Sequence, residues 1–403
     1  MHPIIEQEKR FGAPNYHPLP VVLARGEGVW LWDTDGKKYL DMMSAYSAVS
    51  QGHHHPRIVK ALKDQADRLC VPSRAFHSER LAPLLEKLCK ITGLDTALPM
   101  NTGAEAVETA IKAARRWGYT VKHIPKDKAE IIVGLNNFHG RTTAIISFSS
   151  EPLYREGFGP FVPGFVAVPF GDAKAVEKAI TPNTAAVLME PIQGEAGIIV
   201  PPEGYLKELQ AICKKHNVLL ILDEVQSGLG RTGKMFAFQH EIGVSGKDGP
   251  DGVILGKALG GGLLPVSAFV GKKELMDCFT PGSHGSTFGG NPLAAAVALE
   301  ALAVLEDEHL VERSAEMGAY LLKKLRGLNS PLIREVRGRG LWAGVDIDPK
   351  KARARIVCEK LMARGVLSKE THETVVRLAP PLIINREEID FAVAQLAAVL
   401  AEL

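Results

Sequence analysis

The fold is decided by the stretch Val218-Leu-Leu-Ile-Leu-Asp223, in which five apolar residues are followed by a carboxylate. A second run, Val253-Ile-Leu-Gly-Lys257, also ends in a polar residue. Uninterrupted apolar runs of this length are typical of strands that are buried on both faces of a parallel sheet. We therefore expect Asp223 and Lys257 at the carboxyl ends of two strands, where open α/β sheets place their ligand sites.

An amine and a carboxylate delivered to the same sheet edge suit the chemistry of pyridoxal phosphate. The lysine can form a Schiff base with that cofactor, and the aspartate can pair with its protonated pyridine nitrogen. Each residue also has an ordinary explanation, because Asp223 could be a helix N-cap or turn residue and Lys257 a solvated strand end. The surrounding sequence has to decide between these interpretations.

Strands and helices alternate through the middle of the chain. We expect helices over 56–69, 78–91, 103–119, 172–180 and 203–216, and strands over 98–101, 131–133, 165–168, 185–189, 218–222 and 252–255. This alternation is typical of a mostly parallel sheet with helices on both faces. The sequence therefore predicts an α/β protein.

The pattern changes after Asn291-Pro292. Helices are expected over 293–306, 308–327, 350–364 and 386–402, and strands near 332–336, 341–347, 366–368 and 375–378. Near the start of the chain, Asp35-Gly36 favours a hairpin between 29–33 and 38–41. We expect a large domain over 50–290 and a smaller α+β domain that combines 1–49 with 291–403.

The composition argues against several classes of protein. At 403 residues the chain is longer than a single hydrophobic core usually supports. A net charge of +2 without long basic blocks argues against nucleic acid as a partner. No run approaches about 18 apolar residues, so we expect no membrane-spanning helix. The five cysteines lack metal-binding spacing and the start lacks a signal-peptide pattern, which together favour a cytoplasmic protein.

Two loops offer groups that could bind a phosphate. Asn101-Thr-Gly-Ala-Glu-Ala106 follows a strand, offers the Thr102 hydroxyl and begins a helix, whose N-terminal amides attract anions. Gly285-Ser-Thr-Phe-Gly-Gly-Asn291 offers Ser286 and Thr287. Taken alone, the first loop could be an ordinary helix start and the second a glycine-rich linker.

Two other motifs suggest different chemistry. Gly228-Leu-Gly-Arg-Thr-Gly233 matches the glycine pattern of dinucleotide-binding loops, but no helix start follows it. Asp223 and Glu224 also precede these glycines and would repel a pyrophosphate. His53-His-His55 suggests zinc, yet consecutive histidines do not share a helical face and no second ligand pair supports them. We therefore expect neither a dinucleotide nor a metal.

Several longer stretches together resemble one known family. They are Tyr16-His-Pro-Leu-Pro20, Ser44-Ala-Tyr-Ser-Ala-Val49, Met100-Asn-Thr-Gly-Ala-Glu105, Phe138-His-Gly-Arg-Thr142, Glu190-Pro-Ile-Gln-Gly-Glu-Ala-Gly197, Leu222-Asp-Glu-Val-Gln226, Leu255-Gly-Lys-Ala-Leu259, His284-Gly-Ser-Thr-Phe-Gly-Gly-Asn291 and Val376-Arg-Leu-Ala-Pro-Pro381. Over essentially its whole length the chain is similar to class III (subgroup II) pyridoxal-phosphate aminotransferases, and most similar to the ornithine δ-aminotransferases among them. The resemblance implies a fold type I pyridoxal-phosphate-dependent transferase with a mostly parallel seven-stranded sheet.

The resemblance also implies which residues surround pyridoxal 5′-phosphate. Lys257 would carry the cofactor and move protons, and Asp223 would keep the pyridine nitrogen protonated, so these two are the expected catalytic residues. The other expected cofactor-binding residues are Thr102, Gly103 and Ala104 at the phosphate, Phe138 on the ring, Gln226 at the ring 3′-oxygen, and Ser286 and Thr287, with Thr287 acting on the partner subunit's cofactor.

Five further residues are expected to bind the substrates by the same resemblance. They are Tyr16, Tyr46, Arg141, Glu195 and Arg377. A 2-oxo acid with two carboxylates needs two arginines, Arg141 and Arg377, whereas ornithine brings no anion near its reacting amine. Glu195 would therefore pair with Arg377 in the ornithine half-reaction and release it in the other. A static structural ion pair is the alternative.

The resemblance thus implies a ping-pong transfer of the δ-amino group of L-ornithine to 2-oxoglutarate, which gives glutamate 5-semialdehyde (pyrroline-5-carboxylate) and glutamate. We expect at least a homodimer and a role in arginine catabolism or proline biosynthesis. The alternatives are a related ω-aminotransferase acting on N-acetylornithine or 4-aminobutyrate, an NAD-dependent oxidoreductase, and a non-catalytic binding protein. One departure from the family pattern, an insertion-like polar segment at 245–249, should leave the chemistry intact.

Overall fold

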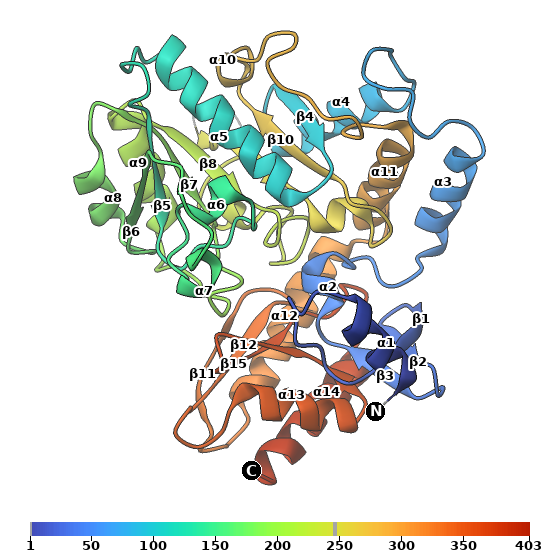
Figure 1. Ribbon diagram of the computed structural model, residues 1–403. Coiled ribbons are helices and arrows are strands. Elements are labelled where there is room, and N and C mark those ends of the chain that lie inside the picture. The colour runs from blue at the N-terminus through green and yellow to red at the C-terminus, as the bar shows by residue number, and fades with distance from the viewer. Residues whose placement is uncertain (1, 245–247) are drawn as a thin grey trace.

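The computed structural model describes residues 2–244 and 248–403, so most of the insertion-like segment lies outside the described residues. The described chain forms two units (Figure 1). The large-sheet unit surrounds a seven-stranded sheet, and the small-sheet unit contains two four-stranded sheets. None of the helices in the described ranges is long and apolar enough to cross a membrane.

The seven-stranded sheet is mostly parallel. In spatial order its strands are β4 (Thr96–Met100), β10 (Ser267–Gly271), β9 (Gly252–Leu255), β8 (Leu219–Asp223), β7 (Thr184–Met189), β5 (Glu130–Gly134) and β6 (Phe165–Val168). Strands β9, β8, β7, β5 and β6 pair in parallel, whereas β10 is antiparallel to both of its neighbours. Every residue of β7 and β8 is buried, which explains their continuous apolar sequences.

Helices cover both faces of this sheet (Figure 1). On one face lies α5 (Gly103–Thr120), whose buried alanines allow the helix to approach the strands closely. The helices α8 (Ala173–Ala179) and α9 (Tyr205–Lys215) contribute to a separate hydrophobic cluster on the opposite face. The remaining longer helices of this unit are α3 (Pro56–Ala66), α4 (Leu81–Thr92) and α11 (Pro292–Asp307), and the shorter ones are α6 (Thr143–Ile146), α7 (Pro152–Arg155) and α10 (Lys273–Met276).

The small-sheet unit joins the two ends of the chain. One sheet contains β1 (Leu23–Glu27), β2 (Trp30–Asp33), β3 (Lys38–Asp41) and β13 (Val366–Leu367), and β13 pairs in parallel with β3. The other contains β11 (Ile333–Gly338), β12 (Ala343–Ile347), β15 (Val375–Leu378) and β14 (Lys369–Thr371). Its helices are α1 (Pro3–Phe11), α12 (Leu310–Arg326), α13 (Ala354–Ala363) and α14 (Arg386–Ala401).

The structure confirms the expected fold class, and the expected helices lie within a few residues of the observed ones. Three strands were not predicted. The first, β10, is the short run Ser-Ala-Phe-Val-Gly, which lacks both a long apolar stretch and a polar alternation. The others, β1 and β14, carry charged residues and lack a continuous apolar run, although each pairs with the strand that follows it in the sequence.

Candidate active site

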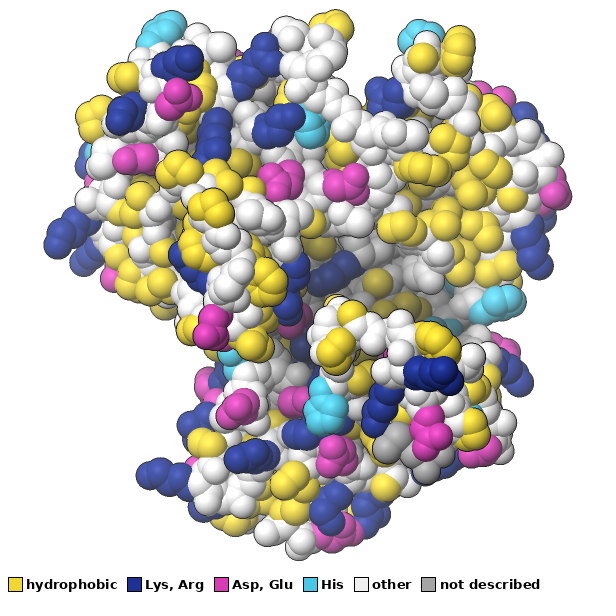
Figure 2. All heavy atoms as spheres, viewed as in Figure 1, with side chains coloured by type: hydrophobic (Ala, Val, Ile, Leu, Met, Phe, Trp, Pro, Cys, Tyr) yellow, Lys and Arg dark blue, Asp and Glu magenta, His cyan; other side chains and the backbone are white. Residues whose placement is uncertain are grey.

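Asp223 and Lys257 lie at the carboxyl ends of adjacent parallel strands, because Asp223 pairs with Ile254 in β9. Both line a cavity with an empty volume of about 630 Å³, part of it open to solvent. Its other lining residues include Gly103, Ala104, Phe138, His139, Glu190 and Gln226. Figure 2 shows that the molecular surface is hollowed between the two units.

The carboxylate of Asp223 is buried and is held by two hydrogen bonds. His139 Nδ1 lies 2.6 Å from Asp223 Oδ2, and the Val225 amide donates to Asp223 Oδ1 at 3.0 Å. Burial opposes a charge on His139, but the hydrogen bond and charge of Asp223 raise the pKa of His139 above its usual value. The contact with His139 fixes the orientation of the carboxylate that a protonated pyridine nitrogen needs as its partner.

The amine of Lys257 is buried within the same cavity. Burial lowers its pKa to about 8, although the charge of Glu195 acts in the opposite direction. A lysine with such a pKa is neutral in a substantial fraction near physiological pH, as nucleophilic attack on a carbonyl requires. Lys257 also has a positive φ of 45°, which is uncommon outside glycine and is typical of residues held in place by a functional site.

The loop after β4 begins α5 with a capping box. Thr102 Oγ1 accepts from the Glu105 amide at 3.2 Å, and Glu105 Oε2 accepts from the Thr102 amide at 2.7 Å. The hydroxyl of Thr102 is therefore used as an N-cap, while the first-turn amides of Gly103 and Ala104 lie at the cavity. A β-carbon at Gly103 would lie 3.0 Å from Val225, so the residue permits a close approach here.

These groups fit pyridoxal phosphate. A buried amine, a buried carboxylate and a helix N-terminus surround one cavity, and Phe138 supplies an aromatic wall. The Nε2 atom of Gln226 is buried at the cavity without a hydrogen-bond partner among the described residues. A ligand oxygen at this position would satisfy that donor.

Two of the expected cofactor-binding residues lie away from the cavity. Ser286 Oγ accepts a hydrogen bond from Asn101 Nδ2 at 3.0 Å, so it is linked to the loop before α5. Thr287 lines a separate, smaller pocket together with Val71 and Phe76. Within one chain, Thr287 is therefore not part of the lining of the cavity that contains Lys257.

Arg377 and Glu195 form an ion pair at 2.6 Å, with a second contact at 3.4 Å. Arg377 is almost completely buried, and its guanidinium carbon lies 4.7 Å from the centroid of the Tyr46 ring. Although burial acts in the opposite direction, Arg377 holds the pKa of Glu195 below its usual value. The Thr371 hydroxyl donates to the Glu195 carbonyl, which fixes the backbone beneath the pair.

Tyr46 is presented by an unusual turn. Residues Ser44 to Ser47 all have positive φ, so α2 (Ser44–Ser47) is a left-handed turn made without glycine. Asp41 Oδ1 accepts from the amides of Met43 and Ser44 at 2.8 and 2.9 Å, and its other oxygen lies 2.7 Å from His53 Nε2. Tyr46 and Tyr16 line a second, mainly apolar pocket, and Tyr16 is 75% exposed.

Arg141 lies at an exposed position in the loop before α6. Its guanidinium carbon is 3.7 Å from the centroid of the Tyr154 ring and 5.5 Å from that of Phe138. A guanidinium supported on aromatic faces keeps its hydrogen-bond donors free for a carboxylate. The geometry therefore suits Arg141 to substrate binding, and Tyr154 is a supporting residue that the sequence did not indicate.

His139 and Glu190 were also not singled out from the sequence. Burial raises the pKa of Glu190 to about 7, and its carboxylate accepts from the amides of Phe138 at 3.0 Å and Gly194 at 3.4 Å. Their position in loops directly after β5 and β7 was the available signal, because Asp223 and Lys257 occupy the same edge of the sheet.

The two remaining motifs are used in other ways. After Gly233 the described chain to Val244 contains only the short 3-10 helix η1 (Ala237–His240), so the glycines do not open an α-helix. In the histidine triplet, His53 contacts Asp41 and His55 Nε2 lies 3.0 Å from Glu308.

The chain matches the class-III aminotransferase family over residues 11–400, and it belongs to that family. Class-III aminotransferases use pyridoxal phosphate, so the cavity belongs to a transaminase that depends on this cofactor.

Individual relatives indicate which members of the family the chain resembles. The ornithine aminotransferase of Brevibacillus brevis is 58% identical over 98% of both chains. The structure of the ornithine aminotransferase from Toxoplasma gondii ME49 superposes with a TM-score of 0.96 at 43% identity, covering 99% of this chain and 94% of that one. The acetylornithine aminotransferase from Elizabethkingia anophelis is also similar, with a TM-score of 0.89, 46% identity and coverage of 99% and 98%.

Proposed function

We propose that this protein transfers the δ-amino group of L-ornithine to 2-oxoglutarate and produces glutamate 5-semialdehyde and glutamate in a ping-pong cycle. The semialdehyde cyclises to pyrroline-5-carboxylate. The name of the Brevibacillus brevis relative, at 58% identity over 98% of both chains, supports this substrate. The observation that carries the proposal is the Glu195–Arg377 ion pair beneath Tyr46, because it neutralises the second arginine that a dicarboxylate would otherwise occupy.

When bound, pyridoxal phosphate supplies an electron sink for the bonds at the reacting carbon. Lys257 holds and moves the proton at its Nζ, and its lowered pKa suits that role. Asp223, fixed by His139, holds the positive charge at the pyridine nitrogen. The amides at the start of α5, with Thr102 as their N-cap, receive the phosphate.

The substrate residues act by charge matching. A dicarboxylate occupies Arg141 and Arg377, and Glu195 then has to leave Arg377. With ornithine the carboxylate reaches Arg141 with Tyr16 assisting, and Arg377 stays neutralised by Glu195. An unpaired buried guanidinium would repel the incoming amine and would be costly to desolvate.

A related ω-aminotransferase acting on N-acetylornithine or 4-aminobutyrate is the second candidate. The similarity to the acetylornithine aminotransferase from Elizabethkingia anophelis favours this alternative. Tyr46 and Tyr16 favour ornithine, because both line one pocket beside Arg377 and could bind the free α-amino group that acetylation converts into a neutral amide.

Half-reaction spectroscopy tests both candidates. The cofactor absorbance is followed while the enzyme is mixed separately with ornithine, N-acetylornithine, 4-aminobutyrate and glutamate. We expect ornithine and glutamate to convert the cofactor most efficiently, and Lys257→Ala to remove the absorption band of the lysine-bound cofactor. A clear preference for N-acetylornithine would refute the proposed donor.

We further propose the domain division 50–290 against 1–49 with 291–403, and a homodimer. The pairing of β3 with β13 and the separate seven-stranded sheet support the division, although α11 packs against α3 and α4 of the large-sheet unit. A group of exposed apolar side chains beside Thr287 supports the dimer, since Thr287 would then meet the partner's phosphate. We also propose a cytoplasmic location and a role in arginine catabolism or proline biosynthesis.

A further inference from the structure

The glycine motif at 228–233 has no part in the proposed chemistry, yet its arginine is completely buried. Arg231 lies in the loop after β8, and within the described ranges no carboxylate forms an ion pair with it. Burial lowers the pKa of Arg231 to about 9, and only the charge of Asp41 acts in the opposite direction. A buried guanidinium is costly, so its contacts should have a specific use.

Arg231 donates four hydrogen bonds to neutral acceptors from distant segments. Its Nη1 donates to the carbonyls of Leu341 at 2.9 Å and Pro380 at 2.6 Å. Its Nη2 donates to the hydroxyls of Ser44 and Ser50, both at 3.1 Å. Arg231 from the large-sheet unit therefore joins the N-terminal segment to the turn before β12 and to the residues that follow β15.

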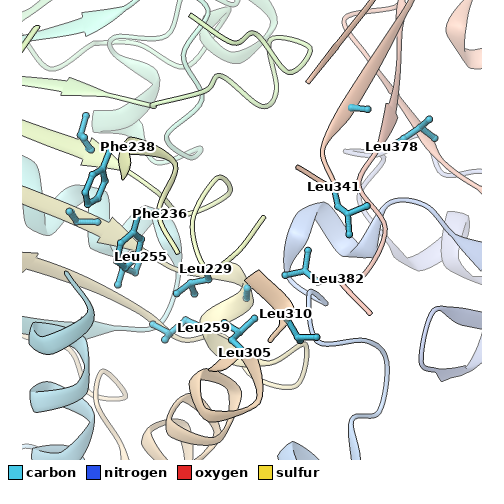
Figure 3. Packing of buried hydrophobic residues seen from close by; sticks show 14 of the residues in the cluster. Leu229, Phe236, Phe238, Leu255, Leu259, Leu305, Leu310, Leu341, Leu378 and Leu382 are labelled. Carbon is cyan, nitrogen blue, oxygen red and sulfur yellow. The ribbon is translucent and has the colours of Figure 1, made fainter. Parts of the chain in front are cut away.

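The backbone of the motif packs closely against the small-sheet unit, which brings Arg231 near its acceptors. A β-carbon at Gly233 would lie 2.9 Å from Ala315 in α12, and one at Gly340 would lie 2.4 Å from the carbonyl carbon of Thr232. Figure 3 shows Leu229 of the motif packed among leucines of the hydrophobic cluster. The glycines thus allow contact between the two units, which explains the motif without a dinucleotide.

The acceptors of Arg231 lie next to the residues expected to bind substrate. Ser44 begins the left-handed turn that presents Tyr46, and its hydroxyl also donates to the Ala379 carbonyl at 2.6 Å. Pro380 lies two residues beyond the end of β15, the strand that carries Arg377. Arg231 therefore ties together the two segments whose side chains meet where Arg377 stacks on Tyr46.

The left-handed turn needs such support. Four consecutive non-glycine residues with positive φ are unfavourable by about 1–2 kcal/mol each. Strained backbone of this kind persists only where several contacts over-determine it. Asp41 supplies two amide contacts, and Arg231 reaches the turn from the opposite unit.

We propose that Arg231 is a positioning residue that sets the preference among amine donors by holding the Tyr46 turn against Arg377. The inference rests on the proposed function, because the preference in question is that for ornithine over N-acetylornithine. Arg231 acts through Ser44 and Pro380 and needs no contact with substrate or cofactor.

The test compares Arg231→Lys and Ser44→Ala with the wild-type holoenzyme. A lysine keeps the charge but cannot donate in two fixed directions, and Ser44→Ala removes the shared hydroxyl with little change in volume. For both variants we expect the ratio of kcat/KM for ornithine to that for N-acetylornithine to fall about tenfold, with most of the loss in the KM for ornithine. In a Tyr46→Phe background the same changes should lower the ratio no further.

Arg313→Lys provides the matched control. Arg313 Nη2 donates to the carbonyls of Ile383 and Ile384 at 2.9 and 2.8 Å, but it does not contact the Tyr46 turn. We expect this variant to lose thermal stability while the donor ratio stays within about twofold of wild type. An unchanged ratio in Arg231→Lys, or an equal fall in Arg313→Lys, would overturn the positioning role. The donor preferred by the wild-type enzyme separately tests the proposed function.

Discussion

Each charged residue of the site has a different neighbouring group that acts on its charge. Asp223 and Lys257 line one cavity without forming an ion pair with each other. His139 contacts the carboxylate of Asp223, and the charge of Glu195 acts on the amine of Lys257. Arg377 is neutralised by Glu195 rather than by the catalytic carboxylate of Asp223. The chemistry of the lysine and the recognition of substrate are therefore electrostatically coupled through Glu195.

Removing the Glu195 carboxylate should affect the two half-reactions unequally. In Glu195→Ala, Arg377 is left buried and unpaired when ornithine enters, whereas glutamate still supplies a carboxylate to it. We expect the rate of the ornithine half-reaction to fall at least about tenfold more than that of the glutamate half-reaction, measured by stopped-flow absorbance. Equal losses would indicate a static structural pair, and Arg377→Ala should instead raise the KM for 2-oxoglutarate.

The buried carboxyl of Glu190 should make stability depend on pH. Burial raises its pKa from an ordinary 4.5 to about 7 in the folded protein. The pKa of Glu190 is therefore higher in the folded protein than in the unfolded chain. The free energy of unfolding falls as the pH rises from 4.5 to about 7, and the full loss is reached above about pH 7. Relative to wild type, Glu190→Gln should therefore gain up to about 3 kcal/mol of unfolding free energy over that window.

Urea denaturation of both proteins without cofactor, at about pH 5 and about pH 8, measures this difference. A difference between the variants that does not change with pH would show that Glu190 is ionised across the whole window. Because wild type and variant are compared at each pH, titration of other groups largely cancels.

The sequence predicted Lys257 and Asp223 as a pair because both end apolar runs and a parallel sheet brings such ends together. It did not predict the roles of His139 and Glu190, because each depends on a contact between loops that follow different strands. It also missed Tyr154, because this residue lies in the short helix α7 and contacts Arg141 in the loop before α6, and neither segment has a strong sequence periodicity.

At the scale of secondary-structure elements, the site depends on which strands are neighbours. Buried strands were predictable from composition, but their spatial order and the antiparallel β10 between β4 and β9 were not, since pairing depends on the whole chain. The left-handed turn at Ser44–Ser47 was equally hidden, because nothing in its sequence requires positive φ. Its conformation is imposed by contacts with Asp41 and Arg231.

Close packing between the loop at 228–233 and the turn before β12 gives a prediction at this scale. Gly340→Ala would place a β-carbon 2.4 Å from the Thr232 carbonyl carbon at a residue with φ of 58°. Gly36→Ala is the matched control, because its φ is 83° but no atom lies within 4 Å of the added carbon. We expect Gly340→Ala to lose about 1–3 kcal/mol more unfolding free energy than Gly36→Ala.

Chemical denaturation of the two glycine variants measures this difference directly. If both lose the same amount, backbone strain alone accounts for the effect, and the contact between the units is softer than the structure indicates. A larger loss in Gly340→Ala supports the interpretation of the glycine motif as a packing device.

At the scale of the whole molecule, segments from both ends of the chain meet beside the large-sheet unit. The N-terminal strand β3 pairs with β13, and α2 lies between the two units (Figure 1). Arg231 contacts the Tyr46 turn through Ser44. The change of pattern along the sequence predicted a smaller domain that combines both ends of the chain, but it did not predict the pairing of β3 with β13, because these strands are separated by most of the sequence. The substrate side of the site is therefore a product of the complete fold.

The proposed dimer can be tested on the apolar side of the large-sheet unit. Hydrophobic side chains gather over the side that carries α3 and α11 (Figure 2), and Phe76 there is 69% exposed beside Thr287. Exposed apolar groups of this kind mark interaction surfaces. We expect Phe76→Asp to shift the protein towards a monomer in analytical ultracentrifugation and to weaken cofactor binding at least about tenfold, because Thr287 then lacks the partner's phosphate.

Ile356→Asp is the matched control for that variant, since Ile356 is 41% exposed on α13 of the small-sheet unit. It introduces the same charge and should change neither the sedimentation coefficient nor the affinity for cofactor. If Phe76→Asp remains dimeric with normal cofactor affinity, the apolar side is not the subunit interface. If it becomes monomeric but keeps its cofactor affinity, the interface is correct and Thr287 has no role at the partner's phosphate.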